Sequence, residues 1–139
     1  MQSLDTAQGL EVREHLEFRV TRDQMRAFAA LSGDDNPIHD DADYARARGF
    51  EGPIVYGGLI LAQVSRLLGT RLPGHGCVWH SLSMQFRTPL YVDEAAELHA
   101  RVTHANEALG LVRLMLEVRA GGRRIASGEA QALRAGAGG

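Results

Sequence analysis

The period of the hydrophobic pattern changes along the chain, and these changes predict the order of its secondary structure elements. Residues 10–20 (LEVREHLEFRV) have a strand-like pattern, and residues 22–32 (RDQMRAFAALS) place apolar side chains at helical spacing. Thr21 and Gln24 match a capping box that predicts where this helix begins, and Gly33 is of the residue type that commonly ends a helix. We therefore expect an N-terminal strand followed by a helix.

Two more helices are predicted before the pattern changes again. Asn36-Pro37 is a turn signal, and residues 41–50 (DADYARARGF) favour a short helix. Pro53 precedes a long apolar segment, residues 54–72, whose first helical turn is rich in glycine. A helix buried on most sides is expected there, because its apolar residues recur at helical spacing: Leu59, Ile60, Val64, Leu67 and Leu68.

From residue 76 onward the pattern alternates with a period of two, which is typical of strands. The first strand is expected to end near Pro89, and three more strand-like segments follow at residues 96–108, 110–120 and 123–134, with hairpin-like connections. In the first strand, one face is expected to carry Val78, Leu82, Met84 and Phe86, and the other Trp79, Ser81, Ser83, Gln85 and Arg87.

The last strand has a face made only of small residues, Ala126, Gly128, Ala130 and Ala132. Small residues let a bulky element such as a helix lie close against a sheet. The predicted order is thus one strand, a helical block and then about four antiparallel strands. This order indicates an α+β fold in which a sheet wraps a helix.

The length and composition are those of one ordinary globular domain, spanning residues 1–139. A formal charge of -2 with 23% charged residues gives no basic surface for nucleic acid or an anionic membrane. The single Cys77 excludes an internal disulfide framework. The N-terminus has no signal-peptide pattern, so we expect a cytoplasmic protein. The small and polar ends, residues 1–9 and 134–139, are expected to be flexible.

The loop after the first predicted helix concentrates groups that can transfer protons, Asp34 and His39, around the Asn36-Pro37 turn. Each also has an ordinary structural interpretation: an aspartate can brace a loop, and a lone histidine is often only a hydrogen-bonded side chain. Ser65 lies in an apolar helix, where a serine commonly bonds to the preceding turn. The sequence has no complete calcium loop, zinc pattern, dinucleotide fingerprint or Gly-x-Ser-x-Gly elbow, so no metal and no cofactor are predicted.

The segment FAALSGDDNPIHDDADYARARGFEGPIVYGGLI, residues 28–60, resembles the hydratase motif of the MaoC-like family, the (R)-specific enoyl-CoA hydratases. That motif runs Ser-x-Asp-x-Asn-Pro-x-His and continues to Pro-Ile-Val-His-Gly, and the match has no gap. The later strands, including LSMQFRTPLYVDE, continue the likeness. The resemblance implies a hot-dog fold, an antiparallel sheet around a long central helix. It also implies homodimers with an acyl-thioester tunnel at or near the subunit boundary.

The resemblance also implies a role for each matching residue. Asp34 and His39 become the catalytic pair, and the backbone N–H of Gly57 becomes the donor to the thioester carbonyl. Asn36 would hold the loop, and Ser65 would support the pair. Tyr56 and Gly58, which flank the backbone donor, join Asn36 and Ser65 as residues expected at the substrate.

Hydration of an enoyl thioester needs the same set of groups. A base takes a proton from water, an acid protonates the α-carbon, and a donor stabilises the enolate. The resemblance implies a hydratase or dehydratase that interconverts a trans-2-enoyl thioester and an (R)-3-hydroxyacyl thioester of coenzyme A or acyl carrier protein.

One departure from the family pattern is plain: Tyr56-Gly57-Gly58 stands where the family usually has His-Gly-Met. The backbone donor is kept, but a phenol replaces an imidazole and a methionine side chain is missing. Three alternatives therefore stay open. They are a hot-dog acyl thioesterase, an enzyme that adds a nucleophile other than water to an enoyl thioester, and a non-catalytic acyl-binding module.

Overall fold

The structure is a computed structural model that describes residues 12–134. Five strands, three α-helices and one short 3-10 helix, η1, make up this part of the chain. In chain order they are β1 (Arg13–Phe18), α1 (Arg22–Ser32), η1 (Pro37–His39), α2 (Ala42–Ala47), α3 (Gly57–Thr70), β2 (Cys77–Phe86), β3 (Ala96–Asn106), β4 (Leu111–Ala120) and β5 (Arg123–Arg134). The predicted order of one strand, a helical block and four strands is confirmed.

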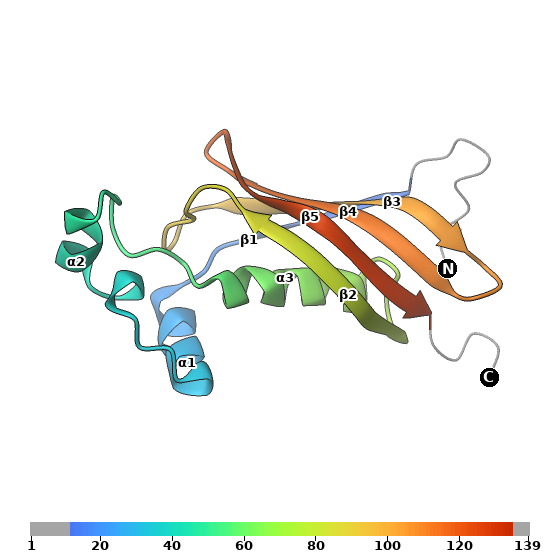
Figure 1. Cartoon of the computed structure of the whole chain (residues 1–139), viewed down its shortest axis with the longest axis horizontal. Coiled ribbons are helices and arrows are strands. Elements are labelled where there is room, and N and C mark those ends of the chain that lie inside the picture. The colour runs from blue at the N-terminus through green and yellow to red at the C-terminus, as the bar shows by residue number, and fades with distance from the viewer. Residues whose placement is uncertain (1–11, 135–139) are drawn as a thin grey trace.

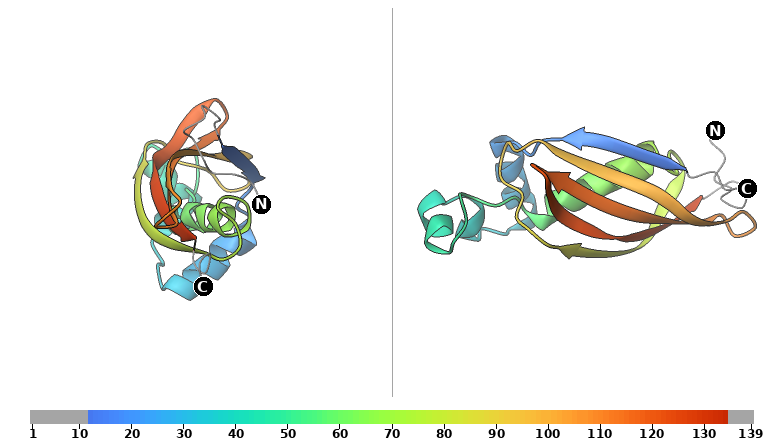
Figure 2. Two further views of the ribbon diagram at one scale, coloured as in Figure 1. Left: turned by 90° about the vertical axis from the view of Figure 1, so that its right-hand side faces the viewer. Right: turned by 90° about the horizontal axis from the view of Figure 1, so that it is seen from above.

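All five strands form one antiparallel sheet in the order β1-β3-β4-β5-β2. The sheet curves around α3, while α1, η1 and α2 lie together at one end of the molecule (Figures 1 and 2). Strands β3, β4 and β5 follow one another as hairpins, whereas β2 crosses to the far edge and pairs with β5. The α+β hot-dog fold predicted above is confirmed.

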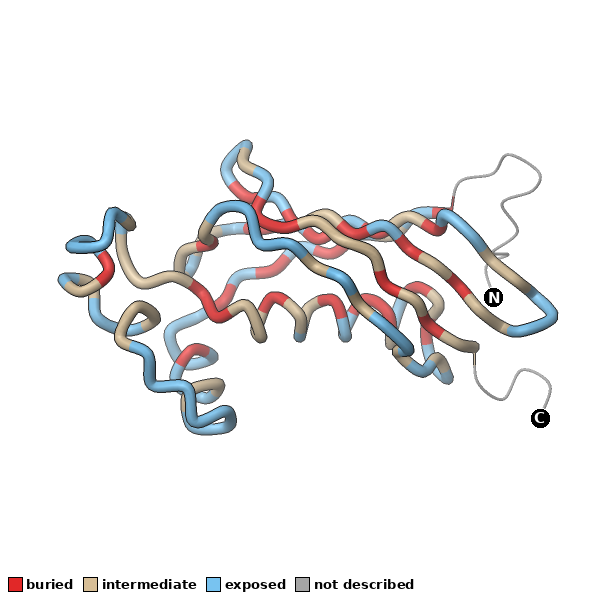
Figure 3. The backbone as a smooth tube through the Cα atoms, in the orientation of Figure 1, coloured by how far each residue is buried: buried red, intermediate tan, exposed pale blue. Residues whose placement is uncertain are grey.

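The core lies between the concave face of the sheet and α3 (Figure 3). Alternate residues of β4 are at most 2% exposed: Val112, Leu114, Leu116 and Val118. Helix α3 contributes Ile60, Val64, Leu67 and Leu68 to the same core. The prediction that this helix is buried on most sides is wrong for the single chain, because the sheet covers only one side of α3. The other side exposes Ala62, Ser65 and Arg66.

The predicted faces of β2 are wrong at one end of the strand. The register with β5 shifts between Trp79 and Ser81, which leaves His80 as an extra residue. Such a bulge moves the residues before it to the opposite face. Trp79 therefore packs against the core together with Leu82 and Met84, and Val78 is 54% exposed.

The small face of β5 lies inward, as predicted, with Ala126, Ala130 and Ala132 fully buried. At Gly128 the neighbouring element is a strand rather than a helix. A Cβ atom there would lie 2.0 Å from the carbonyl oxygen of Ser83 in β2. Glycine is thus required at this position because the β2 backbone approaches so closely.

Local capping fixes the ends of α1 as the sequence predicts. The Thr21 hydroxyl accepts a hydrogen bond from the Gln24 N–H, and the Gln24 side chain accepts one from the Thr21 N–H. Gly33 ends the helix in the left-handed region with φ of 78°. Of the ends expected to be flexible, residues 1–9 and 135–139 lie outside the described residues. Arg134 corrects that expectation, because it is the last residue of β5 and its N–H donates to Gly110 O at 2.8 Å.

Candidate active site

The loop between α1 and η1 is held by its own side chains. Asp34 Oδ1 accepts a hydrogen bond from the Asn36 N–H at 3.1 Å, and Asn36 Oδ1 accepts one from the Ile38 N–H at 3.1 Å. Asn36 is also the N-cap of η1, which agrees with its expected role in holding the loop. The Asp34 side chain is exposed, and its Oδ2 has no partner within residues 12–134. One carboxylate oxygen therefore braces the loop while the other is available to a ligand.

His39 lies at the end of η1 and is partly buried. Its Nδ1 atom is 2.7 Å from the carbonyl oxygen of Ile54. A carbonyl can only accept, so Nδ1 carries a proton and donates it. In the neutral imidazole Nε2 is then left with a free lone pair, which is the form a general base needs.

Tyr56 connects the two members of the expected pair. Its ring stacks on the His39 ring, with centroids 3.8 Å apart and an interplanar angle of 25°. Its hydroxyl donates a hydrogen bond to the backbone carbonyl of Asp34 at 2.7 Å. Burial raises the pKa of the Tyr56 phenol, and the carboxylates of Asp34, Asp40 and Asp35 raise this pKa further. The phenol therefore stays protonated and keeps its role as a donor.

The N-terminus of α3 follows directly after Tyr56, which is the N-cap of this helix. The backbone N–H groups of Gly57 and Gly58 have no hydrogen-bond partner in the part of the chain that the structure describes. Unpaired donors at a helix N-terminus, where the helix dipole is positive, suit an oxygen that gains negative charge. Gly57 is thus placed as a backbone donor should be.

Two aromatic rings cover these glycines. A Cβ atom on Gly57 would lie 3.2 Å from the ring of Phe86, and one on Gly58 would lie 2.4 Å from the ring of Phe28. Phe86 is 51% exposed at the end of β2. The Phe28 ring therefore occupies the space that a side chain at residue 58 would need.

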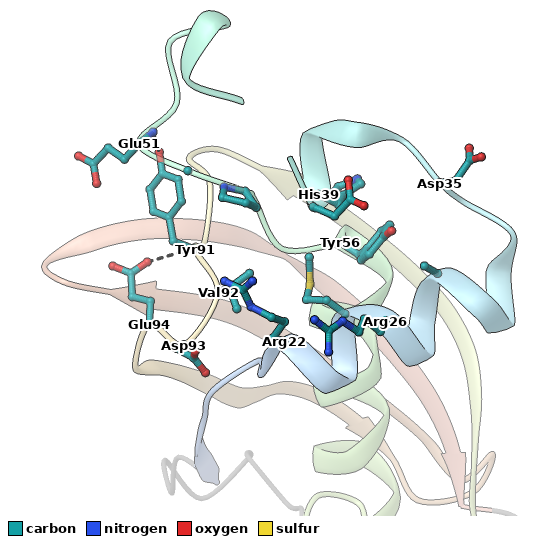
Figure 4. Close-up of a pocket in the computed structure, with 15 residues that line it drawn as sticks. Arg22, Arg26, Asp35, His39, Glu51, Tyr56, Tyr91, Val92, Asp93 and Glu94 are labelled. Carbon is teal, nitrogen blue, oxygen red and sulfur yellow. Dashed lines mark hydrogen bonds between the residues drawn. The ribbon is translucent and has the colours of Figure 1, made fainter. Parts of the chain in front are cut away.

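A cavity of about 630 Å³ lies on the α1 side of the His39–Tyr56 stack. Figure 4 shows His39 and Tyr56 side by side, near Arg22 and Arg26 of α1, with Asp35 pointing away from them. Residues 91–94 line the far wall. None of the other expected site residues lines this cavity: Asp34, Asn36, Gly57, Gly58 and Ser65. The donor at Gly57 instead lies beside the half-exposed Phe86.

The far wall of the cavity is held by an ion pair. Two guanidinium nitrogens of Arg123 contact the two carboxylate oxygens of Glu94, both at 2.9 Å. Arg123 also donates to Pro89 O, and Glu94 accepts from the Tyr91 N–H. The hydrogen bond from Arg123 lowers the pKa of Glu94. The first residue of β5 therefore fixes the segment that faces His39 across the cavity.

Ser65 is the one expected site residue that lies away from the group formed by the loop segment 34–39, Tyr56 and the first turn of α3. It lies eight residues after Gly57 in α3, about 12 Å along the helix axis, with an exposed side chain. Its hydroxyl makes no hydrogen bond to any described residue.

Three contributors to the site were not found from the sequence. They are the Ile54 carbonyl that orients His39, and the rings of Phe28 and Phe86 that cover the two glycines. A backbone carbonyl has no signature in a sequence. The spacing of the two phenylalanines indicates only an apolar helix position for Phe28 and one face of a strand for Phe86, and it gives no hint of their contact with a glycine pair.

Residues 12–134 contain no helix long and apolar enough to cross a bilayer. The same residues contain no cluster of three or more histidine, cysteine, aspartate or glutamate side chains able to hold a metal ion.

Comparison with protein-family models matches residues 4–120 to the MaoC like domain. The chain belongs to the MaoC-like family. It is 37% identical over 128 residues to an (R)-specific enoyl-CoA hydratase of Aeromonas caviae, covering 90% of this chain and 96% of that protein. It is 31% identical over 117 residues to a 3-hydroxybutyryl-CoA dehydratase of Methylorubrum extorquens, covering 84% and 74%.

The solved structure of the (R)-hydratase from A. caviae superposes with a TM-score of 0.84 at 35% sequence identity. The match covers 91% of this chain and 98% of that one. The family resemblance is confirmed, and the names of these relatives support the hydration and dehydration interpretation.

Proposed function

We propose that this MaoC-like protein is a lyase that interconverts a trans-2-enoyl thioester and an (R)-3-hydroxyacyl thioester. One observation carries the proposal: Asp34 and His39 lie on one loop, and both are held by Tyr56 immediately before the free backbone donor of Gly57. The (R) configuration and the thioester substrate follow the names of the relatives. The carrier is coenzyme A or acyl carrier protein, and we favour coenzyme A because both curated relatives above are named for it.

His39 is the group best arranged to move the proton. With Nδ1 donating to Ile54, Nε2 accepts a proton from water as the water oxygen bonds to the β-carbon. The same Nε2 then returns a proton to the α-carbon. Asp34 supports this step by accepting a hydrogen bond, through its unpaired Oδ2, from the other O–H of the water, whose hydrogen stays in the hydroxyl group of the product. The elements of one water molecule are added and no other reactant is needed.

The electrons of the alkene move onto the thioester oxygen during this step. The N–H of Gly57 stabilises that oxygen at the positive end of α3. Asn36 maintains the loop by capping η1, so that Asp34 and His39 keep their separation. Dehydration follows the same path in reverse.

Incubation with crotonyl-CoA tests the proposal. A hydratase lowers the absorbance of the conjugated thioester without releasing thiol, and the product is (R)-3-hydroxybutyryl-CoA. Release of free thiol would indicate a thioesterase, and binding without turnover would indicate an acyl-binding module. Loss of the conjugated absorbance only when an amine is supplied would indicate a different nucleophile.

A homodimer is the second part of the proposal. Strand β2 is an edge strand with unpaired backbone groups on one side, and Val78 and Phe86 on it are more than half exposed. Proteins commonly cover such an edge with a second subunit. Pairing along β2 would also shield Phe86, which lies beside Gly57, and the exposed side of α3 that carries Ser65. The site is more enclosed in such a dimer than in one chain.

Light scattering at micromolar concentration tests this part. We expect twice the 15.1 kDa chain mass, and we expect Val78→Lys to shift the mass toward that of the monomer. A monomer in the unmodified protein contradicts the dimer. The cytoplasmic location also stays a prediction.

A further inference from the structure

Tyr56 contacts both members of the proposed catalytic pair, Asp34 and His39, but is not itself a member of that pair. It follows Asp34 by 22 residues, yet its hydroxyl reaches the Asp34 backbone carbonyl at 2.7 Å. Its ring lies 3.8 Å from the His39 ring. The phenol therefore ties the first and last residues of the loop segment 34–39 to the N-terminus of α3.

The phenol is itself fixed in place. Tyr56 is 4% exposed, and on another side it packs against the ring of Phe28, with centroids 4.7 Å apart. Phe28 occupies this position because Gly58 has no side chain to exclude it. A ring buried in a close-packed interior has little freedom to change rotamer. Tyr56 is thus a rigid support and not a mobile side chain.

Tyr56 is poorly arranged to exchange a proton with substrate. Its hydroxyl hydrogen is already donated to Asp34 O, and the phenol is kept neutral by its surroundings. What it does provide is orientation. The imidazole is held at Nδ1 by Ile54 and on one face by Tyr56, so only Nε2 and the opposite face are left for a ligand.

We propose that Tyr56 is a positioning residue that sets the orientation of the His39 imidazole and the placement of Asp34 through its stack and its hydrogen bond. This inference rests on the proposed hydratase function. It differs from the substrate-binding role expected from the sequence, because it assigns Tyr56 an effect on turnover and not on substrate affinity.

The test compares Tyr56→Phe, which keeps the ring and removes the hydroxyl, with Tyr56→Leu, which removes the stack as well. Tyr44→Phe is the matched control, since the Tyr44 hydroxyl makes no hydrogen bond to the described residues and its ring packs under Arg48. Each variant is assayed for hydration of crotonyl-CoA, and its His39 ring protons are followed by NMR.

We expect Tyr56→Phe to lower kcat at least about tenfold with KM changed less than twofold, since a misplacement of 1 Å can lower a rate about a hundredfold. Tyr56→Leu is expected to lower kcat further and to shift the His39 ring protons downfield, because they lose the shielding of the stacked ring. Tyr44→Phe should match the unmodified protein in both measurements.

Three outcomes overturn the inference. They are a native kcat in folded Tyr56→Phe, a raised KM at unchanged kcat, and His39 resonances in Tyr56→Leu that do not move. If Tyr56→Leu does not fold, the kcat and KM of Tyr56→Phe decide. Failure of the unmodified protein to hydrate crotonyl-CoA overturns the proposed function itself, and with it this inference.

Discussion

The Nδ1 atom of His39 lies 2.7 Å from the backbone carbonyl oxygen of Ile54, fifteen residues further along the chain. This contact decides which nitrogen of the imidazole can act as the base, because a carbonyl cannot donate. A single hydrogen bond between a loop and the segment before α3 thus determines the chemistry available at Nε2.

The tautomer of His39 can be measured directly. In the neutral imidazole we expect Nδ1 to have the nitrogen shift of a protonated ring atom and Nε2 that of an unprotonated one. Long-range proton–nitrogen NMR of the histidine side chains gives both values, with His39→Gln identifying the signals. The reverse assignment would contradict the role given to Nε2.

Gly57→Pro should abolish most of the activity by removing the backbone donor. The helix start tolerates this change well, because proline suits the first position of a helix and Tyr56 has the extended backbone, with φ of -58° and ψ of 132°, that precedes a proline. Loss of such a donor lowers kcat about a hundredfold to a thousandfold.

Gly57→Ala is the control for this prediction. It brings a side-chain carbon to the same 3.2 Å contact with Phe86 but keeps the N–H. Steady-state kinetics on crotonyl-CoA should separate the two variants by at least about tenfold in kcat. Equal activity of the two would remove Gly57 from the mechanism.

Gly58→Ala should destabilise the protein even though alanine favours helices. A Cβ atom there would lie 2.4 Å from the Phe28 ring, which must move away from Tyr56. A Cβ atom at Gly69 in the same helix would have no neighbour within 4 Å. Gly69→Ala should therefore raise the free energy of unfolding by up to about 1 kcal/mol. Urea unfolding compares the two, and an equal gain in both would show that Phe28 does not need the space.

Glu94→Gln should weaken the cavity wall and change how stability depends on pH. The hydrogen bond from Arg123 lowers the pKa of Glu94 in the folded protein below its ordinary value of 4.5. The carboxylate therefore stabilises the fold above that pH, and the stabilisation is lost as the pH falls through the folded-state pKa.

The variant is expected to be less stable at pH 7 and to lose less stability on acidification than the unmodified protein. Urea unfolding at pH 7 and near pH 4 measures both effects. Glu107→Gln, at an exposed position with no ion pair among the described residues, should leave both values unchanged. An unaltered acid dependence in Glu94→Gln would show that the ion pair with Arg123 does not stabilise the wall.

The sequence predicted the elements whose limits depend on near neighbours. Thr21 and Gln24 cap α1 three residues apart, and the alternation in β4 follows directly from its residues. The faces of β2 were wrong before the bulge at His80, because a bulge depends on pairing with β5 and leaves no local pattern.

The site divides in the same way. Asp34, Asn36 and His39 were expected in one loop because five residues separate the ends of that group, and their roles stay predictions. The support from Tyr56 and Ile54 was not predictable, because both contacts join residues fifteen or more positions apart. Ser65 remains a prediction, which a dimer structure can test.

The central claim is that the Asp34 carboxylate and His39 together add water to an enoyl thioester, and the kcat of Asp34→Asn on crotonyl-CoA tests it most directly. Asparagine keeps an oxygen that can accept the hydrogen bond from the Asn36 N–H, so the loop is preserved while the charge is lost. Asp43→Asn, at a fully exposed position in α2, is the matched control. We expect kcat to fall at least about a hundredfold in Asp34→Asn and to be unchanged in the control. A folded Asp34→Asn protein with native turnover would contradict the proposed site.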